Sequence, residues 1–208
     1  MKILVSAGPT REFFDSVRFI SNPSSGRMGY AIAAAARRRG HEVTLVTGPV
    51  NIKPPAGVKV VPVVTAVEMS VACKRAFRTA DAAVMTAAVC DYRPSVRYRT
   101  KTPKAHRPKR ILLEPTEDIA QALGETKGGR LLIGFAMEDA RDPKRLAERK
   151  LQKKHCDLIV LNDTGNVAAT DATIEIFEPS QGWTGPFSGT KTQIATRLVK
   201  LIEQRRRQ

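Results

Sequence analysis

The chain has 208 residues, 42% hydrophobic and 26% charged, a balance typical of a globular protein. Its 35 basic residues outnumber 20 acidic ones, and the formal net charge of +15 favours anionic partners: nucleic acid, an acidic membrane surface or phosphorylated small molecules. No apolar run approaches the roughly 18 residues of a membrane span, and the apolar start is too short for a signal peptide, so we expect a cytoplasmic protein without membrane attachment. Three cysteines, Cys73, Cys90 and Cys156, show neither an even number nor metal-ligand spacing, so disulfides and structural zinc are not expected.

Short apolar segments alternate with helix-like segments along the chain. The expected strands are residues 3–5, 41–46, 58–63, 81–85, 110–113, 131–135, 157–161 and 173–177, and the expected helices are residues 27–39, 66–79, 118–124, 143–154 and 190–204. Strands this apolar, separated by helices, predict an α/β fold with a doubly wound, Rossmann-like, mostly parallel sheet covered on both faces. We expect one domain over residues 1–208.

Two connections are longer than such a fold needs. They are residues 7–24, after the first strand, and residues 87–109, after the fourth. Connections in α/β folds usually have about 2 to 6 residues. Because long loops at the carboxyl ends of parallel strands are where these folds bind ligands, the two segments are the expected location of a functional site.

The first long connection leads into a helix through residues 22–29, NPSSGRMG. A serine is a good N-cap, a glycine lets a ligand approach the backbone, and the free amides of a helix N-terminus favour an anion such as phosphate. A capped helix after a turn explains the segment equally well. A dinucleotide site is disfavoured, because G-x-G-x-x-G is absent and the strand ending at Thr47 lacks a following acidic residue to bind a ribose.

The second long connection is strongly basic. Residues 93–110 contain eight arginines and lysines and no acidic residue, about half of the net charge. A solvated loop or a nucleic-acid arm would explain this charge, but only Tyr92 and Tyr98 lie nearby to stack on bases. A flap over residues 93–110 that closes over a polyphosphate in the active site accounts for the charge, the position and the few aromatics together.

A third basic element is the expected helix after Pro143. Lys150 and Lys154 are four residues apart and therefore lie on one helix face. Like charges at this spacing repel by a few tenths of a kcal/mol unless an anion lies between them. A phosphate-binding pair and an ordinary solvated face both remain possible interpretations.

Several motifs, read together and in order, resemble phosphopantothenate-cysteine ligase, the synthetase half of a bifunctional bacterial flavoprotein of coenzyme A biosynthesis. The motifs are residues 6–12 (SAGPTRE), 17–29 (VRFISNPSSGRMG), 87–94 (AAVCDYRP), 134–138 (GFAME) and 161–163 (LND). The resemblance implies that the carboxylate of 4'-phosphopantothenate attacks the α-phosphorus of CTP, and that cysteine then displaces CMP from the acyl-cytidylate. The flavin-binding half has no counterpart here, so we expect a stand-alone synthetase without flavin, with Mg²⁺ accompanying CTP.

The resemblance also implies roles for single residues. Asn22 would hold the activated carboxyl group through its amide, and Lys101 would act from the flap that closes over the intermediate. The acid substrate would also contact Gly8, Thr10 and Ala87. The nucleotide would be bound by Ser24, Ser25, Gly26, Asp91, Lys104, Asp118, Ile119, Phe135, Lys150 and Lys154, with Asp91 also the candidate contact for the magnesium.

Two segments depart from the family pattern. The family's K-x-K-K motif is Lys101-Thr102-Pro103-Lys104 here, so one lysine is replaced by a stiffer proline. The family's N-P-D-I segment is Thr116-Glu117-Asp118-Ile119, in which only the last two residues match. The choice between CTP and ATP therefore stays open, and an inactive relative of the family is an alternative.

Partners and alternatives complete the expectations. The family pairs as homodimers, so a homodimer is expected here. A separate decarboxylase that takes the ligase product onward is a candidate partner. Neither nucleic acid nor a membrane is an expected partner. The other function classes are an NAD(P)-binding Rossmann oxidoreductase and a basic nucleic-acid module without chemistry.

Overall fold

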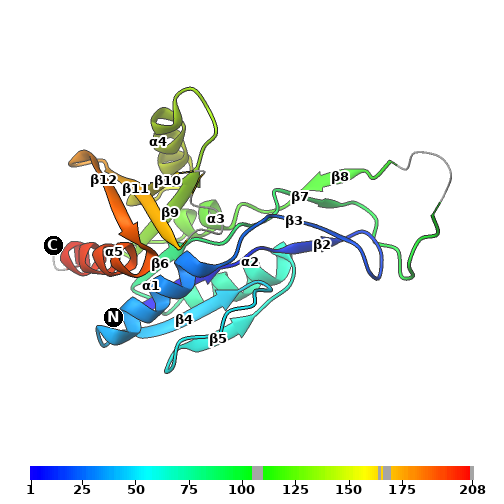
Figure 1. The fold of residues 1–208 in the computed structure, drawn as a ribbon, viewed down its shortest axis with the longest axis horizontal. Coiled ribbons are helices and arrows are strands. Elements are labelled where there is room, and N and C mark those ends of the chain that lie inside the picture. The colour runs from blue at the N-terminus through cyan, green and yellow to red at the C-terminus, as the bar shows by residue number, and fades with distance from the viewer. Residues whose placement is uncertain (105–109, 164, 166–169, 207–208) are drawn as a thin grey trace.

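The computed structural model describes residues 1–104, 110–163, 165 and 170–206 (Figure 1). Its helices are α1 (Arg27–Arg38), α2 (Ala66–Phe77), α3 (Ile119–Glu125), α4 (Pro143–Lys153) and α5 (Lys191–Arg206). An eight-stranded sheet has the order β12 (Gly182–Thr190), β11 (Asp171–Glu178), β10 (Leu158–Asn162), β9 (Leu131–Met137), β6 (Ala82–Met85), β1 (Lys2–Ala7), β4 (Glu42–Thr47) and β5 (Lys59–Pro62).

The sheet is mostly parallel. All neighbours from β10 to β5 pair in parallel, whereas β11 pairs antiparallel with β10 and β12 antiparallel with β11. The chain order reverses between β1 and β6, because β1 leads through α1 to β4 on one side while β6 lies on the other. In open α/β sheets, such a switch point opens a crevice at the carboxyl ends of the strands. The predicted doubly wound α/β fold is confirmed.

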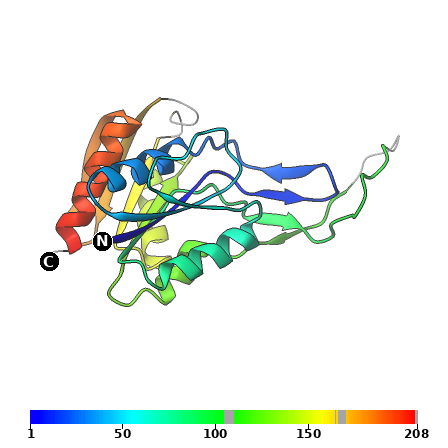
Figure 2. The same ribbon diagram turned by 90° about the horizontal axis from the view of Figure 1, so that it is seen from below.

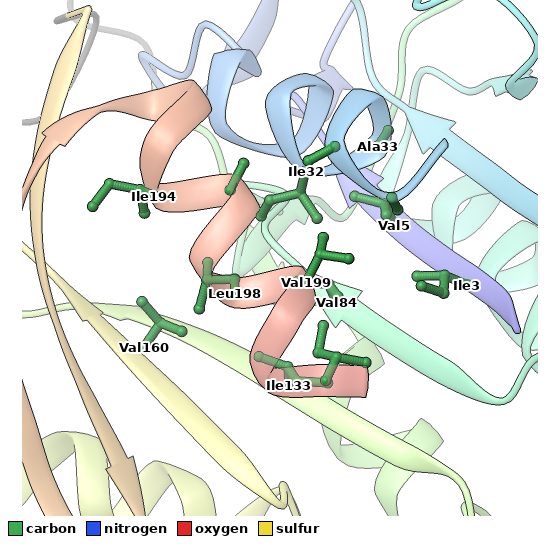
Figure 3. Close-up of a cluster of buried hydrophobic side chains, with 14 of the residues drawn as sticks. Ile3, Val5, Ile32, Ala33, Val84, Ile133, Val160, Ile194, Leu198 and Val199 are labelled. Atoms are coloured by element: carbon green, nitrogen blue, oxygen red, sulfur yellow. The ribbon is translucent and has the colours of Figure 1, made fainter. Parts of the chain in front are cut away.

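Helices cover both faces of the sheet. Successive strand residues point to opposite faces, so Ile3 and Val5 join the core under α1 and α5, whereas Leu4 joins the core under α2, α3 and α4. Figure 3 shows the first of these cores, in which Leu198 and Val199 of α5 lie beside Val160 and other strand residues. The α1 and α5 side of the sheet thus depends on the last helix.

An ion pair joins the ends of α1 and α5. Arg39 donates to both carboxylate oxygens of Glu203, at 2.8 and 2.6 Å, and His41 Nε2 lies 2.8 Å from Glu203 Oε1. The hydrogen bond from Arg39 is the main cause that lowers the pKa of Glu203 to about 2, with His41 adding to it against the effect of burial. Glu203 is therefore ionised at neutral pH and fastens the two helices together.

The two long connections form a pair of antiparallel ribbons outside the sheet. One ribbon is β2 (Arg11–Phe13) with β3 (Phe19–Ser21), and the other is β7 (Tyr92–Pro94) with β8 (Leu113–Pro115). Both views show them projecting from the sheet in the same direction, and β2 contacts β7 (Figures 1 and 2). We call residues 11–21 the first ribbon and the described residues of 92–115 the second ribbon.

The expected sheet strand at residues 110–113 is wrong. The strand there is β8, which begins at Leu113 and pairs only with β7 outside the sheet. Its apolar residues suggested a buried strand, but Leu112 is 76% exposed and both its neighbours are also exposed. In the described residues, no helix is both long and apolar enough to cross a membrane.

Candidate functional site

The loops that follow β1 and β6 are joined at the carboxyl edge of the sheet. The amide of Ala88 donates to Gly8 O (2.9 Å), and the amide of Thr10 donates to Ala88 O (3.3 Å). Thr10 is fully buried, and its Oγ1 accepts a hydrogen bond from the amide of Cys90 (3.0 Å). The predicted substrate residues Gly8 and Thr10 therefore lie beneath the site and hold its two loops in register.

Asn22 ties the first long connection to the loop after β6. Its Nδ2 donates to the carbonyl oxygens of Ala88 and Val89, each at 3.1 Å. A side-chain amide has two hydrogens to donate, so both are engaged with the backbone here. The predicted donation to a substrate oxygen requires Asn22 to release one of these two bonds.

Helix α1 begins at the site without a side-chain cap. Its N-cap is Gly26, in the left-handed conformation at φ 73°, rather than a serine as the sequence suggested. A Cβ on Gly29, in the first turn, would lie 2.6 Å from both Ala7 Cβ and Thr86 Oγ1, so only glycine lets α1 lie this close to β1. The first amides of a helix have no partner within the helix, and here they face the site with a partial positive charge.

A first pocket of about 420 Å³ opens at this helix start. It is lined by Asn22, Pro23, Ser24, Ser25, Gly26, Arg27, Met28, Gly29, Thr86, Ala87, Ala88, Phe135, Ala136, Met137, Asn162 and Lys191. These residues come from the first long connection, α1, and the ends of β6, β9 and β10, with Lys191 from the start of α5. The pocket therefore lies at the switch point, where a ligand is expected in this fold.

A second pocket of about 320 Å³ lies beside the first. Both pockets are lined by Ala87, Ala88, Phe135 and Met137, so they share a boundary. The second pocket alone is lined by the predicted nucleotide residues Asp91, Asp118, Ile119, Lys150 and Lys154. The two predicted groups, the helix start and the lysine pair, are therefore neighbours.

The lysines of α4 are paired with carboxylates in this structure. Lys150 forms an ion pair with Glu138, and Lys154 Nζ lies 3.2 Å from Asp118 Oδ2. Asp118 also caps α3 by accepting a hydrogen bond from the amide of Gln121 (3.1 Å). The repulsion expected between the two lysines is thus offset by these acids. A polyphosphate that bound the lysines would have to replace Glu138 and Asp118 as their partners.

The predicted flap lysines are not part of either pocket. Lys101 and Lys104 are exposed and belong to the second ribbon, and residues 105–109 of the predicted flap lie outside the described residues. Thr102, between the two lysines, is instead bound to the first ribbon. The roles predicted for the two lysines remain predictions.

Asn162 and Lys191 are two polar residues, among several lining residues of the first pocket, to which the sequence analysis assigned no role. Asn162 ends β10, and a polar residue after a buried parallel strand is a signal that could have indicated it. Lys191 is 8% exposed, and burial lowers its pKa, with the charge of Arg27 acting in the same direction. No local pattern marks Lys191, because it reaches the site from a helix far along the chain.

Metal and thiol chemistry are constrained by the side chains present. Among the described residues, no group of three or more histidines, cysteines, aspartates and glutamates is placed to hold a metal ion. All three cysteines are buried and free, and burial raises the pKa of Cys73 and Cys156 to about 12 and also raises the pKa of Cys90. The thiolate is the reactive form of cysteine, so none of the three is a ready nucleophile at neutral pH.

Comparison with known proteins decides the family. The model of the DNA/pantothenate metabolism flavoprotein C-terminal domain matches residues 1–205. The chain belongs to this family. A solved structure, the C-terminal domain of the coenzyme A biosynthesis bifunctional protein CoaBC, shares this fold with a TM-score of 0.85 and 39% identity, covering 98% of this chain and 94% of that one.

Curated relatives of the family carry two kinds of name. The coenzyme A biosynthesis bifunctional protein CoaBC of Mycobacterium bovis is 39% identical over 97% of this chain and 51% of its own length. A cysteine/cysteine sulfinic acid decarboxylase from an unknown prokaryotic organism is 47% identical over 77% of this chain and 45% of its own length. The chain thus spans about half the length of these relatives, and their names point to coenzyme A biosynthesis in one case and to a decarboxylation in the other.

Proposed function

We propose that this chain ligates 4'-phosphopantothenate to cysteine through an acyl-nucleotidylate, with CTP as the expected nucleotide. The observation that carries the proposal is the junction of two pockets along Ala87, Ala88, Phe135 and Met137. One pocket offers the open start of α1, and the other offers Lys150 and Lys154. Such a pair suits a reaction that brings a nucleoside triphosphate against a second substrate. The family's place in coenzyme A biosynthesis agrees with it.

The proposed reaction has two balanced steps. In the first, a carboxylate oxygen of 4'-phosphopantothenate bonds to the α-phosphorus of the triphosphate, and pyrophosphate leaves. In the second, the amino group of cysteine bonds to the acyl carbon, CMP leaves with the bonding electron pair, and the amine loses a proton. Both steps depend mainly on positioning and on offsetting negative charge, because phosphoryl and acyl transfer gain most from these effects.

The side chains can be assigned to these steps by their place in the pockets. The segment Ser24 to Gly26 and the uncapped amides of Arg27 to Gly29 would bind phosphate oxygens. Lys150 and Lys154 would bind the rest of the triphosphate after releasing their acidic partners. Asn22 and Ala87, on the boundary side, would hold the reacting carboxyl group. Lys101 would join from the second ribbon and assist the second step.

Magnesium would enter with the triphosphate. Protein-bound Mg²⁺ usually takes one or two carboxylates together with substrate phosphates and water. Asp91 and Asp118 line the second pocket, so the side chains present fit such a shared ion, with Asp91 the predicted contact. The ion would offset charge on the phosphates, while the residues named above bind and orient the substrates.

The nucleotide base would lie near the altered Thr116-Glu117 segment. Glu117 also lines the second pocket, but its carboxylate accepts hydrogen bonds from Ser70 and Lys74 of α2. The hydrogen bond from Lys74 is the main cause that lowers the pKa of Glu117, so the group is an anion turned toward α2. A nucleotide base would therefore contact mainly neighbouring backbone groups and Phe135. These groups do not determine the choice between CTP and ATP, so the two nucleotides have to be compared by experiment.

The test is a reconstitution with each triphosphate in turn. Purified protein is incubated with 4'-phosphopantothenate, cysteine, magnesium and CTP or ATP, and the product is identified by mass with pyrophosphate release measured in parallel. We expect 4'-phosphopantothenoylcysteine with CTP, and accumulation of the acyl-cytidylate when Lys101→Gln replaces the parent. Absence of product with every triphosphate would identify an inactive relative. A shift in melting temperature with NADPH but not with CTP would instead favour an oxidoreductase.

We also propose that the chain forms a homodimer through its ribbons. Apolar side chains gather there in exposed positions: Val17, Phe19, Tyr92, Val96, Tyr98, Ile111, Leu112 and Leu113. Monomeric proteins rarely expose large contiguous apolar patches. A second copy of the chain, bringing the same ribbons, would cover these side chains.

A further inference from the structure

Asp15 lies in the turn of the first ribbon, where its side chain is fully buried. Its Oδ1 accepts hydrogen bonds from the amides of Val17 (2.8 Å) and Arg18 (2.7 Å). Burial alone would raise the pKa of Asp15, but these backbone bonds and those from Thr102 hold it well below its ordinary value. The group is therefore a buried carboxylate at neutral pH, and such groups persist only with several donors around them.

The remaining donors come from the flap residue Thr102 and from Arg18. Asp15 Oδ2 accepts hydrogen bonds from the amide of Thr102 (3.2 Å) and from Thr102 Oγ1 (2.9 Å). Arg18 Nη1 donates both to Asp15 Oδ2 (3.2 Å) and to Thr102 O (3.2 Å). One buried carboxylate and one guanidinium thus bind the amide, the carbonyl and the hydroxyl of a single flap residue, next to Lys101.

Two other contacts hold the flap against the first ribbon. The amide of Tyr98 donates to Phe14 O (3.0 Å), and the guanidinium of Arg97 lies over the Phe13 ring at 5.0 Å. These contacts are made at residues 97 and 98, four and three residues before Lys101, so they do not fix the backbone at Lys101 itself. The hydrogen bonds to Thr102 act one residue from Lys101 and restrict its backbone directly.

We propose that Asp15 is the positioning residue of the flap, which fixes Thr102 and thereby sets where Lys101 is presented. The importance of Lys101 rests on the proposed ligase function. Asp15 itself touches no substrate, and it acts by reducing the number of conformations of a long loop. A group held in place before the reaction loses less conformational freedom when it engages the substrate.

We call the hydrogen bonds of Asp15 to Thr102 the anchor of the flap. Limited proteolysis tests this anchor without relying on activity. Trypsin cuts after Arg99 and Lys101 when this segment detaches, and fragments are identified by mass. Asp15→Asn keeps the size but loses the charge that holds Thr102, so we expect cleavage at these sites to speed up about tenfold. Thr102→Val removes one donor and should have a smaller effect, whereas Thr102→Ser keeps the hydroxyl and should match the parent in cleavage.

Two controls separate detachment from unfolding. Glu42→Gln makes the same carboxylate-to-amide change at an exposed position at the opposite end of the sheet, and its cleavage should equal that of the parent. Near-UV circular dichroism and cleavage outside residues 93–110 should be unchanged in all variants. If Asp15→Asn fails to fold, Thr102→Val carries the test alone.

Activity then tests the positioning of Lys101. We expect Asp15→Asn to accumulate the acyl-nucleotidylate as Lys101→Gln does, with kcat for amide formation lowered about tenfold, which Glu42→Gln should not reproduce. Parental cleavage rates in both Asp15→Asn and Thr102→Val would overturn the anchor. Faster cleavage without a change in the second step would overturn the positioning role. Faster cleavage in a protein that makes no product under any condition would leave the anchor standing and count against the ligase proposal alone.

Discussion

Asn22 shows how one side chain couples the structure of the site to its chemistry. In the parent, the Asn22 amide donates hydrogen bonds to the carbonyl oxygens of Ala88 and Val89. Asn22→Asp would place a carboxylate against these two oxygens. We expect this variant to be less stable than the parent by about 1–2 kcal/mol at pH 7, because two donors are lost and like charges face each other. Asn22→Ala, which loses the donors without adding charge, should lose less.

Calorimetry at several pH values checks this expectation. A protonated aspartate regains one O–H donor, and the facing carbonyl oxygens raise the folded-state pKa of the introduced carboxyl group above its unfolded value of about 4. The stability deficit of Asn22→Asp relative to Asn22→Ala should therefore shrink as the pH falls toward about 4. A deficit that does not vary with pH would contradict the geometry. Loss of ligase activity in Asn22→Asp alone would not separate a catalytic role from this structural one.

The lysines of α4 give a second test at the scale of single residues. If Lys150 binds the triphosphate, Lys150→Ala should raise the KM for the nucleotide about tenfold, because a hydrogen bond between charged groups is lost. Lys153→Ala, a change on the same helix at a residue that lines neither pocket, is the matched control. Steady-state kinetics with varied CTP checks it, and equal KM values for both variants would remove Lys150 from the nucleotide site.

Part of this site was predictable from local sequence. Residues 22–29 combine a turn, small residues and a helix start, and Lys150 and Lys154 share a helix face, so both patterns indicate anion binding without tertiary information. The bonds of Asn22 to two carbonyls, the burial of Lys191 and the ion pair of Lys154 with Asp118 depend on segments distant in the sequence. No periodicity records such contacts, so they became visible only in the folded chain.

At the scale of elements, the junction of α1 and α5 links stability to pH. The folded-state pKa of Glu203, about 2, is below its ordinary value of 4.5, so its contribution is present above about pH 4.5 and is lost as the pH falls toward 2. Glu203→Gln should lower the unfolding free energy by about 1 kcal/mol at pH 7, a change of about 2–4 °C in Tm for a chain of this size.

Thermal melts across the pH range check the junction. The difference in Tm between the parent and Glu203→Gln should persist from pH 5 to neutral pH, where Arg39 stays charged, and vanish as the pH approaches 2. Glu175→Gln, which removes the surface ion pair with Lys144 at 2.6 Å, serves as a comparison and should change Tm less. A difference that grows on acidification would contradict the assignment.

Most strands and helices followed from hydrophobic periodicity, and the exceptions have physical reasons. β12 was not predicted from periodicity. It contains three glycines and a proline and has no regular alternation, because it is an edge strand with one partner. Residues 111–113 are apolar yet exposed, so their hydrophobicity does not indicate a strand buried in the sheet. Periodicity predicts burial within one chain and does not distinguish an apolar segment that stays exposed in the folded chain.

At the scale of the whole molecule, the ribbons determine the expected association. Leu112→Glu places a charge on the most exposed of their large apolar side chains, and should convert the proposed homodimer into monomers. Sedimentation velocity at several concentrations checks this. Val71→Glu, at an apolar site on α2 that is 63% exposed, is the control that should keep the parental state. A parent that sediments as a monomer at all concentrations would refute the dimer.

The position of α5 has a consequence for how the chain is made. This helix packs on α1, β11 and β12 and shares a core with residues of β6, β9 and β10, yet it is translated after all of them. A nascent chain that ends before Lys191 therefore carries an uncovered apolar sheet face, however well its earlier strands have paired. Completion of the core must wait until the last helix leaves the ribosomal exit tunnel, and until then the unfinished protein is exposed to chaperones and aggregation.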